Sequence, residues 1–222
     1  PGQVVFTFNA THGLNIAIKT LVRPGSRVVI SGYEHNAVTR TLCALEGVRI
    51  GVASAPLFAP EEMVRAFRRQ LDAGADAAVC VHVSNVFGYV LPIEDIAALC
   101  RQRGVPLIVD ASQSAGCLPL DFAALGAAFA AMPGHKGLYG PQGTGLLLCA
   151  DSAQPLMEGG TGSESVRQTM PDFLPDRLEA GTHNIAGIAG LLEGLRYIHR
   201  RGVGNIARHE RQLIRRLGEG LS

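Results

Sequence analysis

Short hydrophobic runs alternate with segments of helical periodicity along the first two thirds of the chain. Seven runs rich in aliphatic and β-branched residues predict strands at residues 3–8, 27–31, 48–53, 77–83, 105–109, 127–132 and 144–149. Four segments between them repeat apolar residues every three or four positions and predict helices at residues 11–22, 37–46, 61–72 and 92–103. This alternation predicts an α/β domain of three layers, with a mainly parallel seven-stranded sheet between helices.

The pattern changes after residue 149. Residues 150–181 are polar and rich in Gly, Ser and Pro, which predicts a long irregular connection of functional importance. Residues 184–201 and 203–217 regain helical periodicity and predict two closing helices. We interpret the arginines on these two helices as a solvated face, because no aromatic residues are interleaved as in a nucleic-acid-binding surface.

Composition excludes several classes of protein. The 222 residues are 47% hydrophobic, enough for the core of one large domain. The net charge of +1 argues against binding to nucleic acid or to an anionic membrane surface. No apolar run is long enough to cross a membrane, and no secretion signal is visible. The five cysteines match neither a metal site nor a disulfide framework, so we expect a reducing cytoplasm.

Polar residues follow the predicted strands, where open parallel sheets bind their ligands. Asn9-Ala10-Thr11 leads from the first strand directly into a helix, whose amides and positive dipole end suit a phosphate group. The alternative is that Thr11 only caps that helix. His35 follows the second strand and Asn85 the fourth, and a purely structural role is the alternative for His35.

Two charged residues follow the fifth and sixth strands. Asp110 ends a hydrophobic run, and a carboxylate there needs a cationic partner unless it serves only as a cap. Lys136 and Lys19 are the only lysines among 20 basic residues, and Lys136 lies in a Gly-rich loop. Because arginine cannot form a Schiff base, a lysine here points to imine chemistry. The order of glycines at 140–145 matches neither the dinucleotide fingerprint nor a P-loop.

A phosphate-binding turn, a histidine, a buried aspartate and a loop lysine together match the needs of pyridoxal phosphate. In such a site the aspartate keeps the pyridine nitrogen protonated, the histidine stacks on the ring and the lysine holds the cofactor covalently. No single one of these residues is specific. Their joint placement after different strands makes the interpretation much stronger.

Seven stretches carry a family resemblance in the same order over nearly the whole chain: FTFNATHGLN, YEHNAV, VSNVFGYVLPI, VDASQSAG, GHKGLYGPQGTG, GGTGS and EAGTHN. The sequence resembles the class V aminotransferase and cysteine desulfurase family, which belongs to the fold-type I pyridoxal phosphate enzymes. The resemblance implies the large cofactor domain of that fold for residues 1–201. It also implies that residues 202–222 form a helix leading toward a C-terminal small domain.

The resemblance assigns residues to the ring of the cofactor. It implies that Lys136 is the Schiff-base lysine and Asp110 the partner of the pyridinium nitrogen. His35 corresponds to the residue that stacks on the ring. Gln113 corresponds to a ligand of the phenolic oxygen, and Asn85 to a residue beside that oxygen and the substrate.

The resemblance also assigns a phosphate site. It implies that Ala10, Thr11 and His135 hold the phosphate, and that Thr161 reaches the phosphate of a neighbouring subunit, hence a homodimer. The chain departs from the family pattern at Pro133, where desulfurases commonly have a phosphate-binding serine. It departs again at His12, where glutamate is usual.

The activity implied by the resemblance is that of a cysteine desulfurase, which converts L-cysteine to L-alanine and passes the sulfur on, in some cases to an acceptor protein. An aminotransferase, a selenocysteine or β-eliminating lyase, and an inactive fragment that keeps only the fold are the alternatives. The arginine for the substrate carboxylate and the sulfur-accepting cysteine of the family normally belong to the small domain. We therefore expect no sulfur acceptor among the chain's cysteines: Cys43, Cys80, Cys100 and Cys149 as core residues, and Cys117 near the site.

Overall fold

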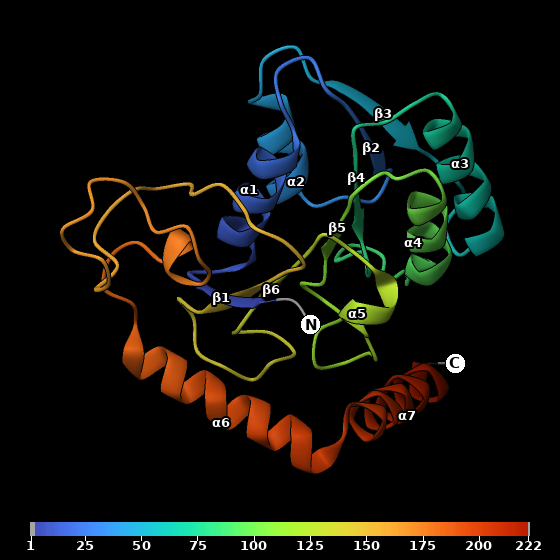
Figure 1. Cartoon of the computed structure of the whole chain (residues 1–222). Helices are drawn as coiled ribbons and strands as arrows, with labels where there is room; N and C mark the ends of the chain where they lie inside the picture. Colours follow the sequence, from blue (N-terminus) through green and yellow to red (C-terminus); the bar gives the residue numbers. More distant parts are fainter. Residues whose placement is uncertain (1–2, 222) are drawn as a thin grey trace.

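One twisted sheet organises the molecule (Figure 1). The computed structural model describes residues 3–221. The strands are β1 (Gln3–Thr7), β2 (Arg27–Ser31), β3 (Arg49–Ala53), β4 (Ala77–Val81), β5 (Leu107–Asp110), β6 (Phe129–Pro133) and β7 (Gly145–Cys149). Their order is β1-β7-β6-β5-β4-β2-β3, and only β7 runs antiparallel to its neighbours. The predicted seven-stranded, mainly parallel sheet is confirmed.

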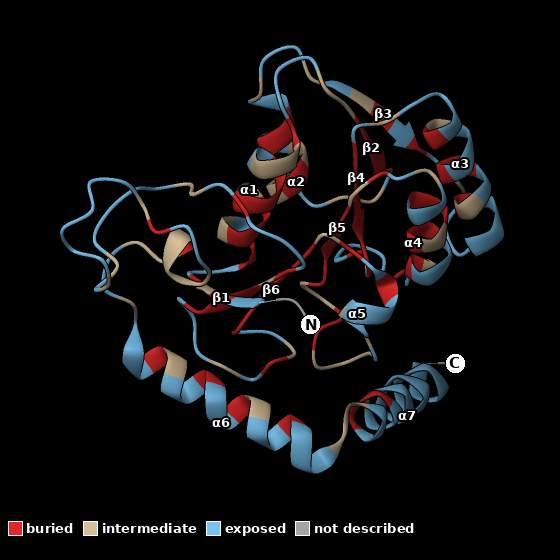
Figure 2. Ribbon diagram, viewed as in Figure 1, coloured by how far each residue is buried: buried red, intermediate tan, exposed pale blue. Residues whose placement is uncertain are grey.

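Helices cover both faces of the sheet. Helices α1 (Ala10–Leu21) and α2 (Asn36–Cys43) contact each other and share a hydrophobic core with one face. The other core is formed with α3 (Pro60–Asp72), α4 (Ile93–Gln102), α5 (Phe122–Leu125), α6 (Ile185–Arg201) and α7 (Val203–Leu221). Every residue of β4 and β6 is buried, as expected for strands covered on both sides (Figure 2).

The topology creates a crevice between β2 and β4, which are neighbours in the sheet. The chain leaves β2 toward α2 on one face and leaves β4 toward α4 on the other face. The two connections therefore separate at the carboxyl ends of these strands. In open α/β sheets such a switch point is where ligands bind.

Several details differ from the sequence prediction. The sequence did not predict α5, whose single turn lies between the Asp121 cap and Gly126, a residue with φ of 62°. Residues 150–181 are irregular as predicted, apart from the short 3₁₀ helix η1 (Asp176–Leu178), and the irregular segment continues to residue 184. Helix α7 packs only through its first turns, at Ile206 and Ala207.

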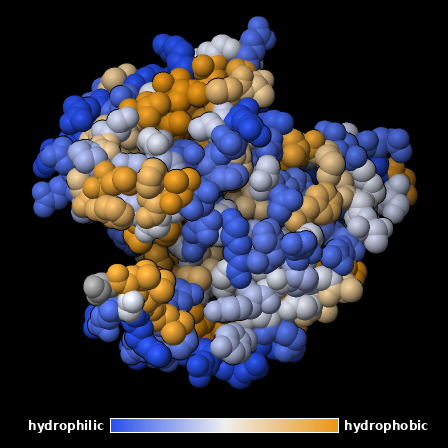
Figure 3. Space-filling model, turned by 180° about the vertical axis from the view of Figure 1, so that it is seen from behind, coloured by the Kyte–Doolittle hydropathy of each residue, from blue (hydrophilic) through white to orange (hydrophobic). Residues whose placement is uncertain are grey.

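The rest of α7 leaves apolar side chains exposed, at Leu213, Ile214, Leu217 and Leu221 (Figure 3, lower left). Within residues 3–221, no helix combines the length and the apolar character needed to cross a lipid bilayer.

Candidate active site

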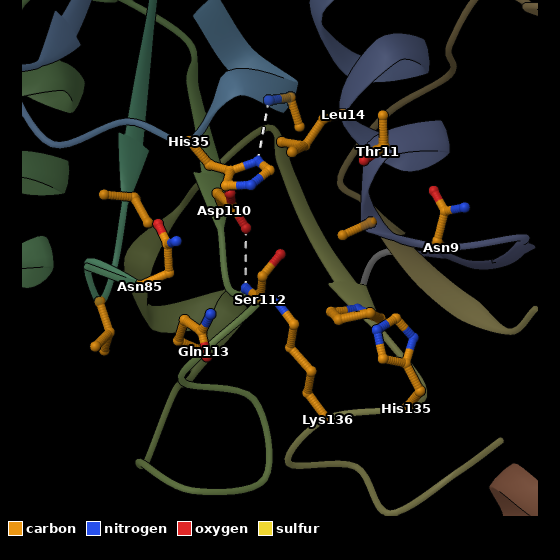
Figure 4. Close-up of a pocket in the computed structure, with 15 residues that line it drawn as sticks. Asn9, Thr11, Leu14, His35, Asn85, Asp110, Ser112, Gln113, His135 and Lys136 are labelled. Carbon is orange, nitrogen blue, oxygen red and sulfur yellow. Dashed lines mark hydrogen bonds between the residues drawn. The ribbon is translucent and has the colours of Figure 1, made fainter. Parts of the chain in front are cut away.

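A cavity of about 290 Å³ opens at the carboxyl ends of the strands (Figure 4). Its lining includes every site residue predicted from the sequence except Thr161: Ala10, Thr11, His35, Asn85, Asp110, Gln113, His135 and Lys136. Residues to which the sequence analysis gave no role in the site complete the lining: Asn9, Leu14, Ala37, Val81, Val83, Ser112 and Pro133. Five of these lie within two residues of a predicted residue, so strand-end position was the signal that could have found them.

The start of α1 forms one end of the cavity. Asn9 is the N-cap, and its side chain accepts the His12 N–H at 3.0 Å. The alternative reading of Thr11 as that cap is therefore wrong. The first-turn amides of Ala10 and Thr11 lie beyond the reach of this single cap, at the positive end of the helix dipole, which suits an anion.

His12 does not line the cavity, although it occupies a position where the family usually has glutamate. Its ring stacks on Phe8 with 4.8 Å between the ring centroids, and its Nδ1 accepts the Phe8 N–H at 3.3 Å. Burial lowers the pKa of His12, and nearby His183 lowers it further. This histidine is thus a neutral structural residue beside the phosphate end of the cavity.

His35 lies at the opposite wall, where it caps α2. Its Nδ1 accepts the Ala37 N–H at 3.0 Å, which fixes the orientation of the ring. The side chain is otherwise exposed and reaches over the cavity in front of Asp110 (Figure 4). The structural role proposed as an alternative is real, and it leaves one edge of the ring and both faces free for a ligand.

Asp110 ends β5 at the floor of the cavity and is only 2% exposed. Its Oδ1 accepts the Ser112 N–H at 2.9 Å, so it does cap the following turn. Across residues 3–221, no ion pair involves Asp110. A carboxylate this buried is costly without a cation, so a cationic ligand group fits here.

Lys136 comes from the loop between β6 and β7, and backbone hydrogen bonds shape that loop. The Gly134 N–H donates to the Thr144 carbonyl at 2.8 Å, and the Tyr139 N–H closes a turn on the Lys136 carbonyl at 2.9 Å. The lysine side chain is exposed and extends from this turn toward the cavity (Figure 4). The turn therefore presents a single amine to the space above Asp110.

Close backbone contacts hold the lysine loop against its neighbours. At Gly116, where φ is 83°, a Cβ would lie 2.0 Å from the Gly137 carbonyl oxygen. At Gly194 of α6, a Cβ would lie 2.3 Å from the Leu138 carbonyl oxygen. Only glycine permits these approaches. The loop that carries Gln113 and the loop that carries Lys136 are thereby pressed together and supported by α6.

Thr161 is not brought to this cavity. It lies in the irregular connection, where its Oγ1 is 3.2 Å from the Ser163 hydroxyl, and it lines a separate, open hollow formed by residues 154–177. Within a single copy of the chain, Thr161 and the predicted phosphate residues contribute to different cavities.

The cysteines follow the sequence prediction with one exception. Cys80, Cys100 and Cys149 are buried, and burial raises the pKa of Cys100 and Cys149 to about 12. Cys43 is exposed, so its expected place in the core is wrong: it lies on the exposed side of the last turn of α2, next to the buried Leu42. Cys117 is half-buried with its thiol 3.8 Å from Glu210 Oε1, and burial and that carboxylate raise its pKa. For Cys80, Cys100, Cys117 and Cys149 the raised pKa disfavours a thiolate.

Comparison with known proteins identifies the relatives of this arrangement. The family model of the class V aminotransferases matches residues 1–222. A probable cysteine desulfurase of Pyrococcus abyssi is 32% identical over 99% of this chain and 57% of its own length. A probable cysteine desulfurase of Xylella fastidiosa is 35% identical over 99% of this chain and 55% of its own length.

Solved structures agree with the sequence comparisons. The apo structure of the cysteine desulfurase from Thermococcus onnurineus superposes with a TM-score of 0.85 at 31% identity, over 99% of this chain and 57% of that one. The chain thus spans a little over half the length of the relatives it matches. The family model, the sequence relatives and the shared fold agree with the site geometry, and the chain belongs to the class V aminotransferase family.

Proposed function

We propose that this chain is the cofactor-binding part of a pyridoxal phosphate enzyme that acts as a cysteine desulfurase. The observation that carries the proposal is the cavity itself, which gathers Thr11, His35, Asp110 and Lys136 from four separate segments of the chain. The cysteine desulfurases among its relatives support the choice of reaction. They favour it over transamination and over other lyase reactions.

The donor set fits the cofactor. Asp110 supplies a buried negative charge for a ring nitrogen, and the α1 N-terminus with the Thr11 hydroxyl and His135 supplies donors for a phosphate. Pro133 supplies neither a hydroxyl nor an N–H, so we expect the amides of Ala10 and Thr11 to carry more of the phosphate binding. Pyridoxal phosphate, when bound, withdraws electrons from the Cα of an amino acid.

The chain's own groups would divide the remaining work. Lys136 would attach the cofactor through Nζ and, once released by substrate, take up and return the proton at Cα. His35 would stack on the ring with its orientation fixed by Ala37. Gln113 and Asn85, which line the same wall, would donate to the phenolic oxygen.

We extend the proposal to assembly and setting. Thr161 would reach the phosphate of a neighbouring copy, which makes the active form a homodimer. The substrate is a small amino acid, and a sulfur-acceptor protein is a further partner. All five cysteines are free, and we place the protein in the cytoplasm.

Trapping the covalent attachment tests the cofactor. Borohydride reduction in the presence of pyridoxal 5′-phosphate, followed by peptide mass mapping, should label Lys136. Lys136→Arg keeps the positive charge and should abolish the label, whereas Lys19→Arg is the matched control and should retain it. Label on Lys19, or no label, contradicts the proposal.

The reaction is tested on the intact protein with L-cysteine. Equal amounts of L-alanine and transferred sulfur are expected, with no dependence on a 2-oxo acid. Alanine formed only with a 2-oxo acid acceptor would instead show transamination. Pyruvate with sulfide would show elimination.

A further inference from the structure

A buried carboxyl group lies directly behind the cavity wall, and the chemistry proposed above does not use it. Glu34 immediately precedes His35 in the turn between β2 and α2. The residue is partly exposed as a whole, but its carboxyl is turned inward, and Oε2 is buried without a hydrogen-bond partner. The other oxygen, Oε1, accepts the Val81 N–H at 2.8 Å and also the Ser31 hydroxyl.

Strand geometry explains why Val81 needs this partner. The N–H groups of Ala78 and His82 donate toward β5, to Pro106 and Asp110. Alternate residues of a strand donate to opposite sides, so the Val81 N–H points toward β2. The pairing of β2 with β4 ends at Ile30 and Val79, and Gly32 turns away to donate to Ala53 of β3. The carboxyl of Glu34 occupies the place that the next residue of β2 would have filled.

The same carboxyl connects segments that form the cavity wall. On one side it is one residue from His35, which caps α2 above the cavity. On the other side it holds Val81, which lines the cavity and pairs with Asp110 across β4 and β5. Beyond Val81 the chain continues to Val83 and Asn85, which also line the cavity. A single buried group therefore spans the crevice where β2 and β4 diverge.

The charge environment favours the neutral form of this group. Burial, the largest cause, and the neighbouring Asp110 carboxylate raise the pKa of Glu34, the hydrogen bonds from Ser31 and Val81 lower it, and the net result is a pKa of about 8. Both donors point to Oε1, so the proton belongs on Oε2. Cys80, the other titratable group nearby, is a neutral thiol because burial raises its pKa well above the ordinary value. Among the described residues, Asp110 is then the only acidic side chain that lines the cavity.

We propose that Glu34 is a positioning residue, whose buried carboxyl joins the His35 turn to the end of β4 and so sets the distance between His35 and Asp110. The part of this inference that concerns pyridoxal phosphate rests on the proposed function. The contact of Glu34 with Val81 does not rest on it, because this contact joins two segments of the protein.

Amide hydrogen exchange tests the contact between Glu34 and Val81 without any cofactor. In the intact protein, Glu34→Ala should speed the exchange of the Val81 amide about 10- to 100-fold, since one buried hydrogen bond is lost. Glu34→Gln keeps an acceptor oxygen in place and should restore slow exchange. Glu34→Asp is one methylene too short and should resemble Glu34→Ala. Tyr33→Phe removes the neighbouring hydrogen bond to the Ala55 carbonyl and is the matched control, with Val81 exchange unchanged.

Titration with pyridoxal 5′-phosphate in the absence of substrate tests the positioning. Glu34→Ala and Glu34→Asp should weaken binding about 10-fold at temperatures well below their Tm, and Glu34→Gln should restore it. Unchanged Val81 exchange in Glu34→Ala, or a Glu34→Gln protein that behaves like Glu34→Ala, overturns the proposal. Fast Val81 exchange with normal cofactor affinity overturns the positioning role and leaves a structural one. If the wild-type protein itself binds no pyridoxal 5′-phosphate, the proposed function fails. Val81 exchange still decides whether Glu34 joins the His35 turn to β4.

Discussion

Predicted site residues lie both at the carboxyl ends of the strands, which we call the rim, and in the connection of residues 150–184. These two regions are built in opposite ways. Residues at the rim follow strand ends, and backbone hydrogen bonds and glycine contacts fix them. The connection has no strand, and its charged residues pair with one another at the surface: Arg167 with Glu164 and with Asp172, and Arg177 with Asp172. Exposed pairs of this kind contribute little to stability.

The difference shows what a sheet can do that a loop cannot. Every rim residue predicted from the sequence lines one cavity, because parallel strands end at a common edge. Thr161 lies in the connection and lines another hollow. A rim residue can therefore act within one copy of the chain, whereas Thr161 needs a second copy to meet a phosphate held at the rim.

The largest expected effect is at Asp110, on the floor of the cavity. Asp110→Asn keeps the acceptor for the Ser112 N–H but removes the negative charge. We expect exchange of the substrate Cα hydrogen with solvent deuterium to slow on the order of 10³-fold, because the ring nitrogen loses its charged partner. Asp172→Asn in the connection is the control and should exchange at the wild-type rate. Wild-type exchange in Asp110→Asn contradicts the role given to this residue.

The next comparison concerns packing, which should be tighter at the rim than in the connection. In Gly137→Ala the new Cβ would lie 2.4 Å from the Ala115 carbonyl oxygen, so we expect a loss of about 1–3 kcal/mol in the free energy of unfolding. In Gly160→Ala no atom lies within 4 Å, and the change should stay within about 0.5 kcal/mol. Denaturant unfolding of both variants measures the contrast. Equal losses would show that the rim is not the more tightly built region.

The two threonines give a smaller and more specific comparison. Thr11→Val should weaken binding of pyridoxal 5′-phosphate about 10-fold, with no effect on pyridoxal, which has no phosphate. Thr161→Val should show the same selectivity only in a sample that sedimentation shows to be dimeric. A Thr161→Val effect in a monomer, or an equal effect on pyridoxal, would rule out the assignment to a neighbouring subunit.

The last comparison concerns the pH dependence of stability. Because burial raises the pKa of Glu34 from 4.5 to about 8, the folded protein binds a proton that the unfolded chain releases, and stability falls as the pH rises from about 5 to 8. Glu34→Gln should remove this decline, so its Tm should gain on the wild type by roughly 10 °C over that range, since each pKa unit corresponds to about 1.4 kcal/mol. In the connection, the hydrogen bond from Arg167 lowers the pKa of Asp172, and Asp172→Asn should leave the decline unchanged. Parallel Tm curves for wild type and Glu34→Gln would contradict the buried, protonated state.

Local pattern was enough for most of the fold and for the list of rim residues. Strand and helix periodicities are properties of consecutive residues, so all seven strands and six of the helices were predictable within a few residues at their ends. Asp110 and Lys136 stood out because a charge after a buried strand needs a chemical reason. The four-residue α5 escaped prediction because one turn is too short to show a period. Cys43 was misplaced because it lies on the exposed side of α2, whereas its neighbours Thr41 and Leu42 face the core.

The amino-acid sequence by itself thus determined which residues follow each strand and which chemistry they offer. Only the tertiary structure decided the order β1-β7-β6-β5-β4-β2-β3, and with it the divergence of β2 and β4 that turns the Glu34 carboxyl inward to Val81. It also decided that Asn9 rather than Thr11 caps α1, and that Thr161 lies away from the rim. The physical reason is that burial and pairing depend on which distant segments meet, and strand order is set by packing between both layers of helices rather than by any local repeat.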